Sequence, residues 1–130
     1  MNKQPWLFVV IESEEAKERV AETVYAQDNI RKCAFAVAIA TEGGKYPLDC
    51  GRALQNMFLT AWNEGVVSCP NGMADPEAAA RALGLDEGWL PLNIPSFGYP
   101  KRDLAPESKS VEEWSAEANR KPLDELIRRI

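Results

Sequence analysis

The chain has 130 residues, which is enough for one domain with a hydrophobic core and too few for two. Hydrophobic residues make up 45% of it, so intrinsic disorder over most of the length is excluded. The net charge is −5, from 15 Lys and Arg against 20 Asp and Glu, so we expect no binding to nucleic acid or to an anionic membrane.

The chain contains no histidine, which excludes mechanisms that need an imidazole base or ligand. If the protein is an enzyme, a cofactor must therefore supply the difficult chemistry.

Cys33, Cys50 and Cys69 are widely spaced and form no C-x-x-C pair, so neither a disulfide framework nor a metal site is expected. All three are expected to be inert, with Cys50 on the inner side of a helix and Cys33 and Cys69 as small core residues. A cytoplasmic location is expected, because the apolar run after Met1 is too short for a signal peptide or a membrane span.

Two apolar runs in the first third of the chain predict strands. Residues 6–11 are continuously apolar and predict a strand buried on both faces, and residues 33–40 repeat this pattern. Between them, Ser13 is a good N-cap for an amphipathic helix, and Glu14 and Glu15 suit its first turn.

The middle of the chain predicts a long helix followed by shorter elements. Apolar residues recur with helical spacing over residues 48–64, which predicts the central helix of the fold, ended by Gly65. A short strand is expected at 66–69. Asp75 and Pro76 then begin a helix that ends at Gly84.

Two prolines interrupt the apolar run at 90–97, so the strand expected there is irregular or at an edge.

We expect a core over residues 1–100 and a tail over 101–130 that docks on the core or on a partner subunit. Ser110 and Glu113 have capping-box spacing, and an apolar stripe follows with i, i+3, i+4, i+7 spacing: Leu123, Leu126, Ile127 and Ile130. The alternation of strands and helices predicts a layered α+β or α/β domain.

Five short motifs follow one another along almost the whole chain. They are Asn2-Lys3-Gln4-Pro5-Trp6, Asp49-Cys50-Gly51-Arg52-Ala53-Leu54-Gln55-Asn56-Met57, Trp62-Asn63-Glu64-Gly65-Val66-Val67-Ser68, Ser96-Phe97-Gly98-Tyr99-Pro100, and Arg120-Lys121-Pro122-Leu123-Asp124-Glu125-Leu126. In this order they resemble the nitroreductase family of flavin enzymes. The resemblance implies an α+β layered sheet with a long central helix and flanking helices.

The sequence departs from the family's pattern before the first motif. Family members carry helices with an Arg/Ser-rich phosphate-binding motif upstream of the Asn-x-Gln-Pro-Trp element, whereas here Met1 directly precedes Asn2. We therefore expect an N-terminally truncated product, a misassigned start or a fragment, with a shortened functional variant as the alternative.

The resemblance also implies a flavin mononucleotide (FMN) site. Asn2 corresponds to a flavin-contacting Asn, Pro70, Asn71 and Gly72 correspond to the turn near the ring's N5 and O4 atoms, and Arg120 corresponds to a phosphate-binding Arg. For each there is a structural alternative: Asn2 frayed at the terminus, the Pro-Asn-Gly run a plain turn, and Arg120 a solvated surface residue. No catalytic side chain is assigned, and no metal is expected.

By resemblance, the chain is an FMN-dependent NAD(P)H oxidoreductase that reduces nitroaromatic, quinone or similar acceptors by a ping-pong hydride mechanism. It would act as a homodimer with two interface sites. The alternative is a non-catalytic dimerisation or flavin-holding remnant of the same family.

Overall fold

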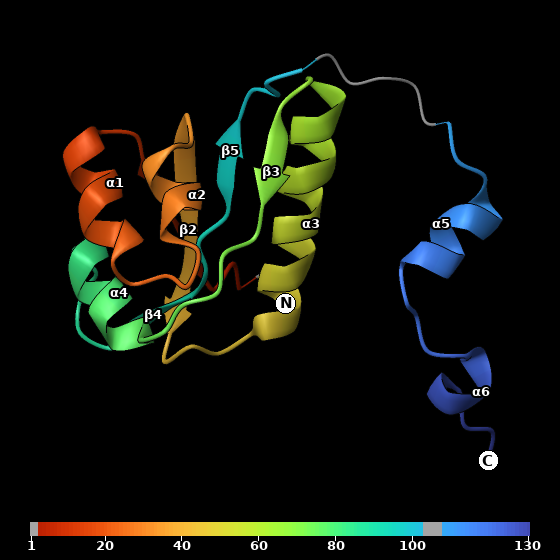
Figure 1. Cartoon of the computed structure of the whole chain (residues 1–130). Helices are drawn as coiled ribbons and strands as arrows, with labels where there is room; N and C mark the ends of the chain where they lie inside the picture. Colours follow the sequence, from red (N-terminus) through yellow and green to blue (C-terminus); the bar gives the residue numbers. More distant parts are fainter. Residues whose placement is uncertain (1–2, 103–107) are drawn as a thin grey trace.

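The computed structural model describes residues 3–102 and 108–130. Within these residues the strands form one antiparallel sheet in the order β1 (Trp6–Ile11), β2 (Phe35–Glu42), β5 (Ser96–Gly98) and β3 (Val67–Cys69), with β4 (Trp89–Asn93) also paired to β2. Three helices, α1 (Glu14–Ala21), α2 (Gln27–Arg31) and α4 (Pro76–Leu83), cover one face, and α3 (Pro47–Asn63) covers the other (Figure 1). The expected α+β layered fold is confirmed.

Strand β2 lies at the centre of the sheet and of the core. It pairs with β1 on one side and with both β4 and β5 on the other, and its residues 36–41 are all buried. Ala36 and Ala38 belong to a cluster with Val20 of α1, Ile30 of α2 and Ala79 of α4. Because alanines have small side chains, the helices of this layer pack close to the strand.

Strand β1 forms where residues 6–11 predicted a strand, but the prediction that both of its faces are buried is wrong. Leu7, Phe8 and Val10 are 43%, 42% and 59% exposed, whereas Ile11 is buried. The reason is the strand's position at the edge of the sheet, where β2 is its one partner in the described chain and only Val9 and Ile11 contact the core cluster.

The predicted helix ends are confirmed. The Ser13 hydroxyl accepts a hydrogen bond from the Ala16 backbone N–H at 3.2 Å, and an Asp75 carboxylate oxygen accepts one from the Ala78 N–H at 2.9 Å. These bonds satisfy N–H groups that have no partner inside the helix. Gly65 after α3 and Gly84 after α4 adopt left-handed backbone conformations, with φ values of +73° and +67°.

The expected long helix is α3, and its apolar stripe is only partly covered. Cys50 is its one buried residue, while Leu48, Leu59 and Trp62 are 75%, 59% and 61% exposed. We call these three exposed residues the α3 apolar face. The inward position predicted for Cys50 is confirmed, and burial, with a smaller effect of the Asp49 carboxylate, raises the pKa of its thiol.

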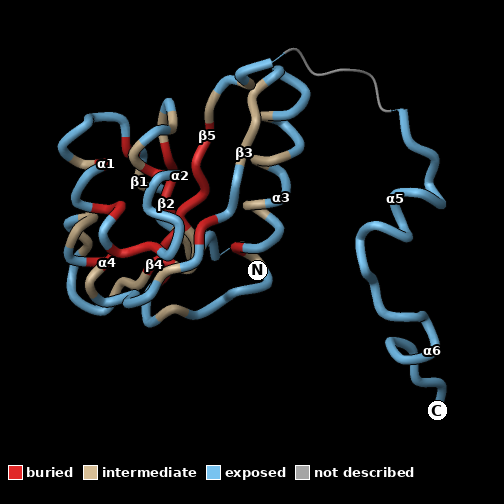
Figure 2. Tube along the Cα trace, in the orientation of Figure 1, coloured by how far each residue is buried: buried red, intermediate tan, exposed pale blue. Residues whose placement is uncertain are grey.

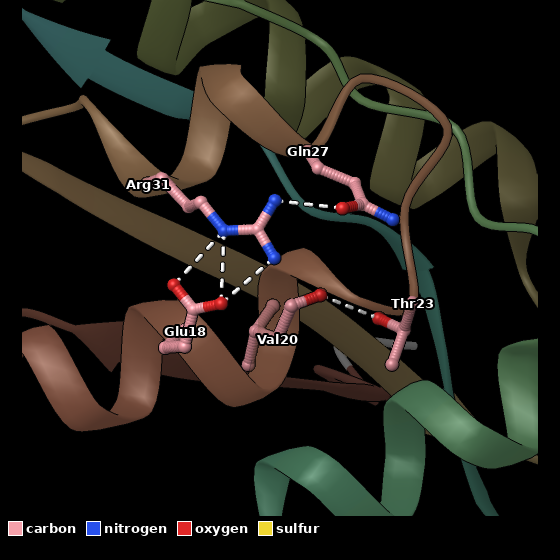
Figure 3. Close-up of polar contacts among 5 residues, drawn as sticks. All are labelled: Glu18, Val20, Thr23, Gln27 and Arg31. Atoms are coloured by element: carbon pink, nitrogen blue, oxygen red, sulfur yellow. Dashed lines mark hydrogen bonds and ion pairs between the residues drawn. The ribbon is translucent and has the colours of Figure 1, made fainter.

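Helices α1 and α2 are joined by a network of polar side chains (Figure 3). Arg31 Nε lies 2.9 Å from both carboxylate oxygens of Glu18, and another Arg31 nitrogen donates to the Gln27 side-chain oxygen at 2.6 Å. The Thr23 hydroxyl donates to the Val20 carbonyl in the connection. A guanidinium that bonds several acceptors has its orientation fixed, so the short helix α2 is held in place on α1.

The irregular strand predicted at 90–97 is confirmed as two short strands. Pro91 lies inside β4 opposite Ala40, where the β2–β4 pairing shifts register, and Pro95 separates β4 from β5. Proline has no N–H to donate, so the ladder is interrupted at these positions.

The tail contains α5 (Val111–Glu117) and α6 (Leu123–Leu126), and none of their residues is buried (Figure 2). The predicted capping box is confirmed by reciprocal bonds between Ser110 and Glu113 at 3.2 and 2.8 Å. Leu123 and Ile130 are exposed, and docking of the tail on the core or on a partner stays a prediction. Across the described residues, no helix is both long and apolar enough to cross a bilayer.

Candidate functional site

A polar cavity of about 310 Å³ lies between α2 and the strands β3 and β5. Its lining includes Asp28, Asn29, Lys32, Cys33, Cys69 and Tyr99. Ligand pockets begin at about 300 Å³ and combine apolar surface with a few fixed polar groups. This cavity has such a composition, and it adjoins the 70–72 segment that follows β3.

The Asn71 side chain holds the 70–72 segment against the sheet. Asn71 is 2% exposed, and its Nδ2 donates to the carbonyls of Cys69 at 3.2 Å and Ile94 at 2.8 Å, and lies 3.2 Å from the Ser96 hydroxyl. A buried amide with satisfied hydrogen bonds contributes to a single well-defined conformation. The segment is therefore tied to β3, to β5 and to the connection before β5.

Asn29 of α2 links this segment to the cavity wall. Its Nδ2 donates to Asn71 Oδ1 at 2.9 Å and to the Cys69 sulfur at 3.4 Å. Since Asn29 and Cys69 both line the cavity, the bond to Cys69 joins two parts of its wall, and the bond to Asn71 joins the wall to the 70–72 segment.

The backbone of the 70–72 segment carries free donors. Within the described part of the chain, the backbone N–H groups of Asn71 and Gly72 donate no hydrogen bond, although the Gly72 carbonyl accepts one from the Tyr25 N–H at 3.0 Å. A Cβ atom on Gly72 would lie 3.3 Å from the Tyr25 ring, so glycine permits this close approach. Gly72 is exposed, so its N–H is available to an acceptor outside the protein, whereas Asn71 is buried.

The charges at the cavity come from two residues of the α2 region. Lys32 and Asp28 form an ion pair at 2.5 Å, and this hydrogen bond holds the pKa of the Asp28 carboxyl below its usual value. Lys32 is the one cationic side chain among the described lining residues, and its side chain is largely exposed. It can therefore reach an anionic group in the cavity without a large desolvation cost.

The two cysteines of the cavity differ in environment. Burial raises the pKa of the Cys33 thiol, and Cys33 is half-buried. Cys69 is exposed, so its prediction as a core residue is wrong; it ends β3 at the cavity wall instead of joining the core cluster. No group of three potential metal-ligating side chains occurs in the described residues.

The predicted site residues are not all brought together. Pro70, Asn71 and Gly72 border the cavity region, and Pro70 and Gly72 are exposed. Arg120 lies in the exposed tail between α5 and α6 and forms no hydrogen bond or ion pair with the described residues. Asn2 lies outside the described residues. Asn29 was not predicted, because no local pattern indicates that it bonds a residue 42 positions away.

A second cleft, of about 440 Å³, lies between α3 and the sheet and is almost entirely apolar. The rings of Phe35 and Phe97 stack in its wall with centroids 5.0 Å apart. Among the lining residues Glu64 is the one charged group, so this cleft suits apolar side chains better than a phosphorylated ligand.

The model of the Nitroreductase family matches residues 22–99, which is more than half of the chain. The chain belongs to the nitroreductase family. The matched region contains α2, the 70–72 segment and the whole cavity lining.

Two archaeal relatives are both named "Putative NADH dehydrogenase/NAD(P)H nitroreductase". The relative from Archaeoglobus fulgidus is 28% identical over 77% of this chain, and the one from Methanothermobacter thermautotrophicus is 24% identical over 88%. The chain spans 64% and 68% of the length of these two nitroreductase relatives.

Solved structures of nitroreductase-family proteins share the fold. A Bacteroides thetaiotaomicron protein with the same printed name matches with a TM-score of 0.70 and 26% identity, over 87% of this chain and 71% of its own. A Clostridium difficile family member matches with a TM-score of 0.75 and 23% identity, over 98% of this chain and 74% of its own. An iodotyrosine deiodinase bound to FMN and 3-iodo-L-tyrosine matches with a TM-score of 0.68 and 15% identity, over 85% and 76% of the two chains.

Proposed function

We propose that this nitroreductase-family chain is an FMN-dependent NAD(P)H oxidoreductase that reduces a nitroaromatic, a quinone or a similar small acceptor. The observation that carries the proposal is the cavity, whose wall combines polar and apolar groups and which adjoins the exposed, unused backbone N–H of Gly72. A backbone donor held in a fixed position is suited to the polar edge of a flat redox ring.

The residues present fit the ring end of FMN. The exposed N–H of Gly72 can donate to a ring acceptor, and Lys32 can contact a ring edge that gains negative charge. When bound, FMN would supply the hydride chemistry, which amino-acid side chains do not provide. The protein would orient the ring and limit the access of water.

For the phosphate end we propose Arg120, together with Asn2 at the ring. A guanidinium matches the fork geometry of a phosphate, and Arg120 is exposed and without a partner in the described chain. We propose that the protein is a cytoplasmic homodimer in which the tail of one subunit docks on the other, because the tail's apolar stripe is exposed. Each site would then take NAD(P)H and the acceptor in turn.

The test is a titration of the purified chain with FMN, followed by NADH and NADPH oxidation with a nitroaromatic or a quinone as acceptor. We expect quenching of flavin fluorescence at a saturable stoichiometry, and acceptor-dependent oxidation that requires FMN. Circular dichroism of the same sample shows whether the chain is folded. A folded chain that neither binds FMN nor oxidises NAD(P)H overturns the proposal.

A second candidate function is a non-catalytic, flavin-holding or dimerising module. It is favoured by the engagement of Lys32 with Asp28, which leaves the cavity with little net positive charge for a phosphate. Its signature in the same titration is FMN binding or dimer formation without NAD(P)H oxidation.

A further inference from the structure

The buried hydrogen-bond network around Asn71 fixes the orientation of two amides in succession. Asn71 Nδ2 lies within bonding distance of two backbone carbonyls, Cys69 O and Ile94 O, and carbonyls can only accept. The amide nitrogen of Asn71 must therefore face these carbonyls, and its Oδ1 must face the other way. Exchanging the two atoms would place an oxygen against two oxygens in a buried site.

The orientation of Asn71 determines that of Asn29. Asn71 Oδ1 is an acceptor, so the Asn29 atom 2.9 Å away must be the Nδ2 donor. The same nitrogen also donates to the Cys69 sulfur. Both hydrogens of the Asn29 amide are thus used on the protein, and its Oδ1 accepts no hydrogen bond from any residue in the described part of the chain.

We propose that Asn29 is a specificity-determining residue that presents its side-chain oxygen, as an acceptor, to an N–H donor of the ligand in the cavity. Asn29 lines the cavity, and the buried Asn71 prevents its amide from turning to offer a donor instead. The ligand class is a heteroaromatic ring with an imide or lactam N–H.

This inference rests on the proposed function in one respect, which is the identity of the ligand. The pyrimidine portion of an isoalloxazine ring has an imide N–H at N3 between two carbonyl acceptors. The cavity offers the acceptor on Asn29 and a donor on Lys32, and the exposed N–H of Gly72 lies in the adjoining segment. A site that accepts a hydrogen bond discriminates against an analogue that lacks the donor, because the bound analogue covers the acceptor without pairing it.

The experiment measures dissociation constants for FMN and for FMN methylated at N3, with the wild-type chain, Asn29→Ala and Asn63→Ala. Asn63 is the matched control, because it is an exposed asparagine on α3, away from the cavity. We expect the wild type and the control to bind the methylated flavin about three- to tenfold more weakly than FMN, as the loss of one hydrogen bond predicts. Asn29→Ala should bind the two flavins with nearly equal affinity.

Lumichrome and N3-methyl lumichrome, which carry the same imide edge without a phosphate chain, separate the inference from the proposed function. If the wild type binds a flavin and its N3-methylated form with equal affinity, the role of Asn29 is overturned, whereas the proposed dependence on FMN is not affected. Binding of lumichrome with loss of discrimination in Asn29→Ala, but no binding of FMN, supports the role of Asn29 and overturns the FMN proposal. Binding of neither ring overturns both.

Discussion

At the scale of single residues, neighbouring positions of one segment can serve the fold and the site separately. The resemblance assigns Asn71 to the flavin, but its side chain is occupied by protein acceptors and the residue is buried, so the exposed Gly72 beside it is left to offer an N–H to a ligand. The sequence Pro70-Asn71-Gly72 predicts a chain reversal from its composition alone. It carries no sign of Ile94 or Asn29, which come from distant parts of the chain.

Replacing Arg120 by alanine tests the phosphate end of the proposed site. We expect Arg120→Ala to weaken FMN binding by about 1.5–3 kcal/mol, which is the usual contribution of a hydrogen bond to a charged group. Fluorescence titration of the two proteins measures the difference. Arg128→Ala, which removes an equal charge from the same tail, is the control. If Arg120→Ala and the wild type have the same dissociation constant, Arg120 is not part of the site.

At the scale of elements, local signals determined most of what was predictable. Capping residues and apolar spacing act over only a few residues, so the start of α1, the C-terminal end of α3 and both ends of α4 follow from the sequence. The exposure of β1 and of Cys69 does not, because burial depends on which element packs on a strand. In the same way, the cavity is formed by α2 and β3, which are far apart in the sequence and meet only in the folded chain.

The cap of α4 predicts a pH dependence of stability. The Ala78 backbone N–H holds the pKa of the Asp75 carboxyl below its usual value. Its stabilising effect is therefore complete above the unfolded pKa of about 4 and is lost as the pH falls through the lower folded pKa. The variant Asp75→Asn keeps a capping oxygen but has no titrating group, so its stability should not depend on pH through this position.

Urea unfolding at pH 7 and at about pH 3 measures this effect. We expect the wild type to lose more stability between the two values than Asp75→Asn does. Glu18 and Asp28, whose pKa values are lowered by Arg31 and Lys32, are present in both proteins and cancel in the comparison. Equal losses in the two proteins would show that the Asp75 carboxylate does not stabilise the helix.

At the scale of the whole molecule, the described chain exposes two apolar surfaces besides the edge strand β1. One is the α3 apolar face, and the other is the stripe of the tail that includes Leu123 and Ile127. Exposed apolar patches of this kind mark interaction sites, and a homodimer would cover both in each subunit.

Replacing Leu59 by lysine tests this assembly. A charge placed in the α3 apolar face should be strongly unfavourable in a buried interface and nearly neutral on a free surface. We expect light scattering to give a dimer for the wild type and a monomer for Leu59→Lys, with an unchanged circular dichroism spectrum. Glu87→Lys, an exposed residue outside this face, should remain dimeric. A wild-type monomer, or a dimer that persists in Leu59→Lys, excludes this face as the interface.

The position of β2 in the sheet bears on how the protein is synthesised. This strand ends at residue 42, but β4 and β5, which pair with one of its edges, follow it and end only at residues 93 and 98. Translation proceeds at about 5–20 residues per second, so this edge of β2 remains unpaired for several seconds until β4 and β5 have been synthesised. A nascent chain stalled before residue 90 therefore presents an incomplete sheet to chaperones, and completion of β5 marks the point at which the core can close.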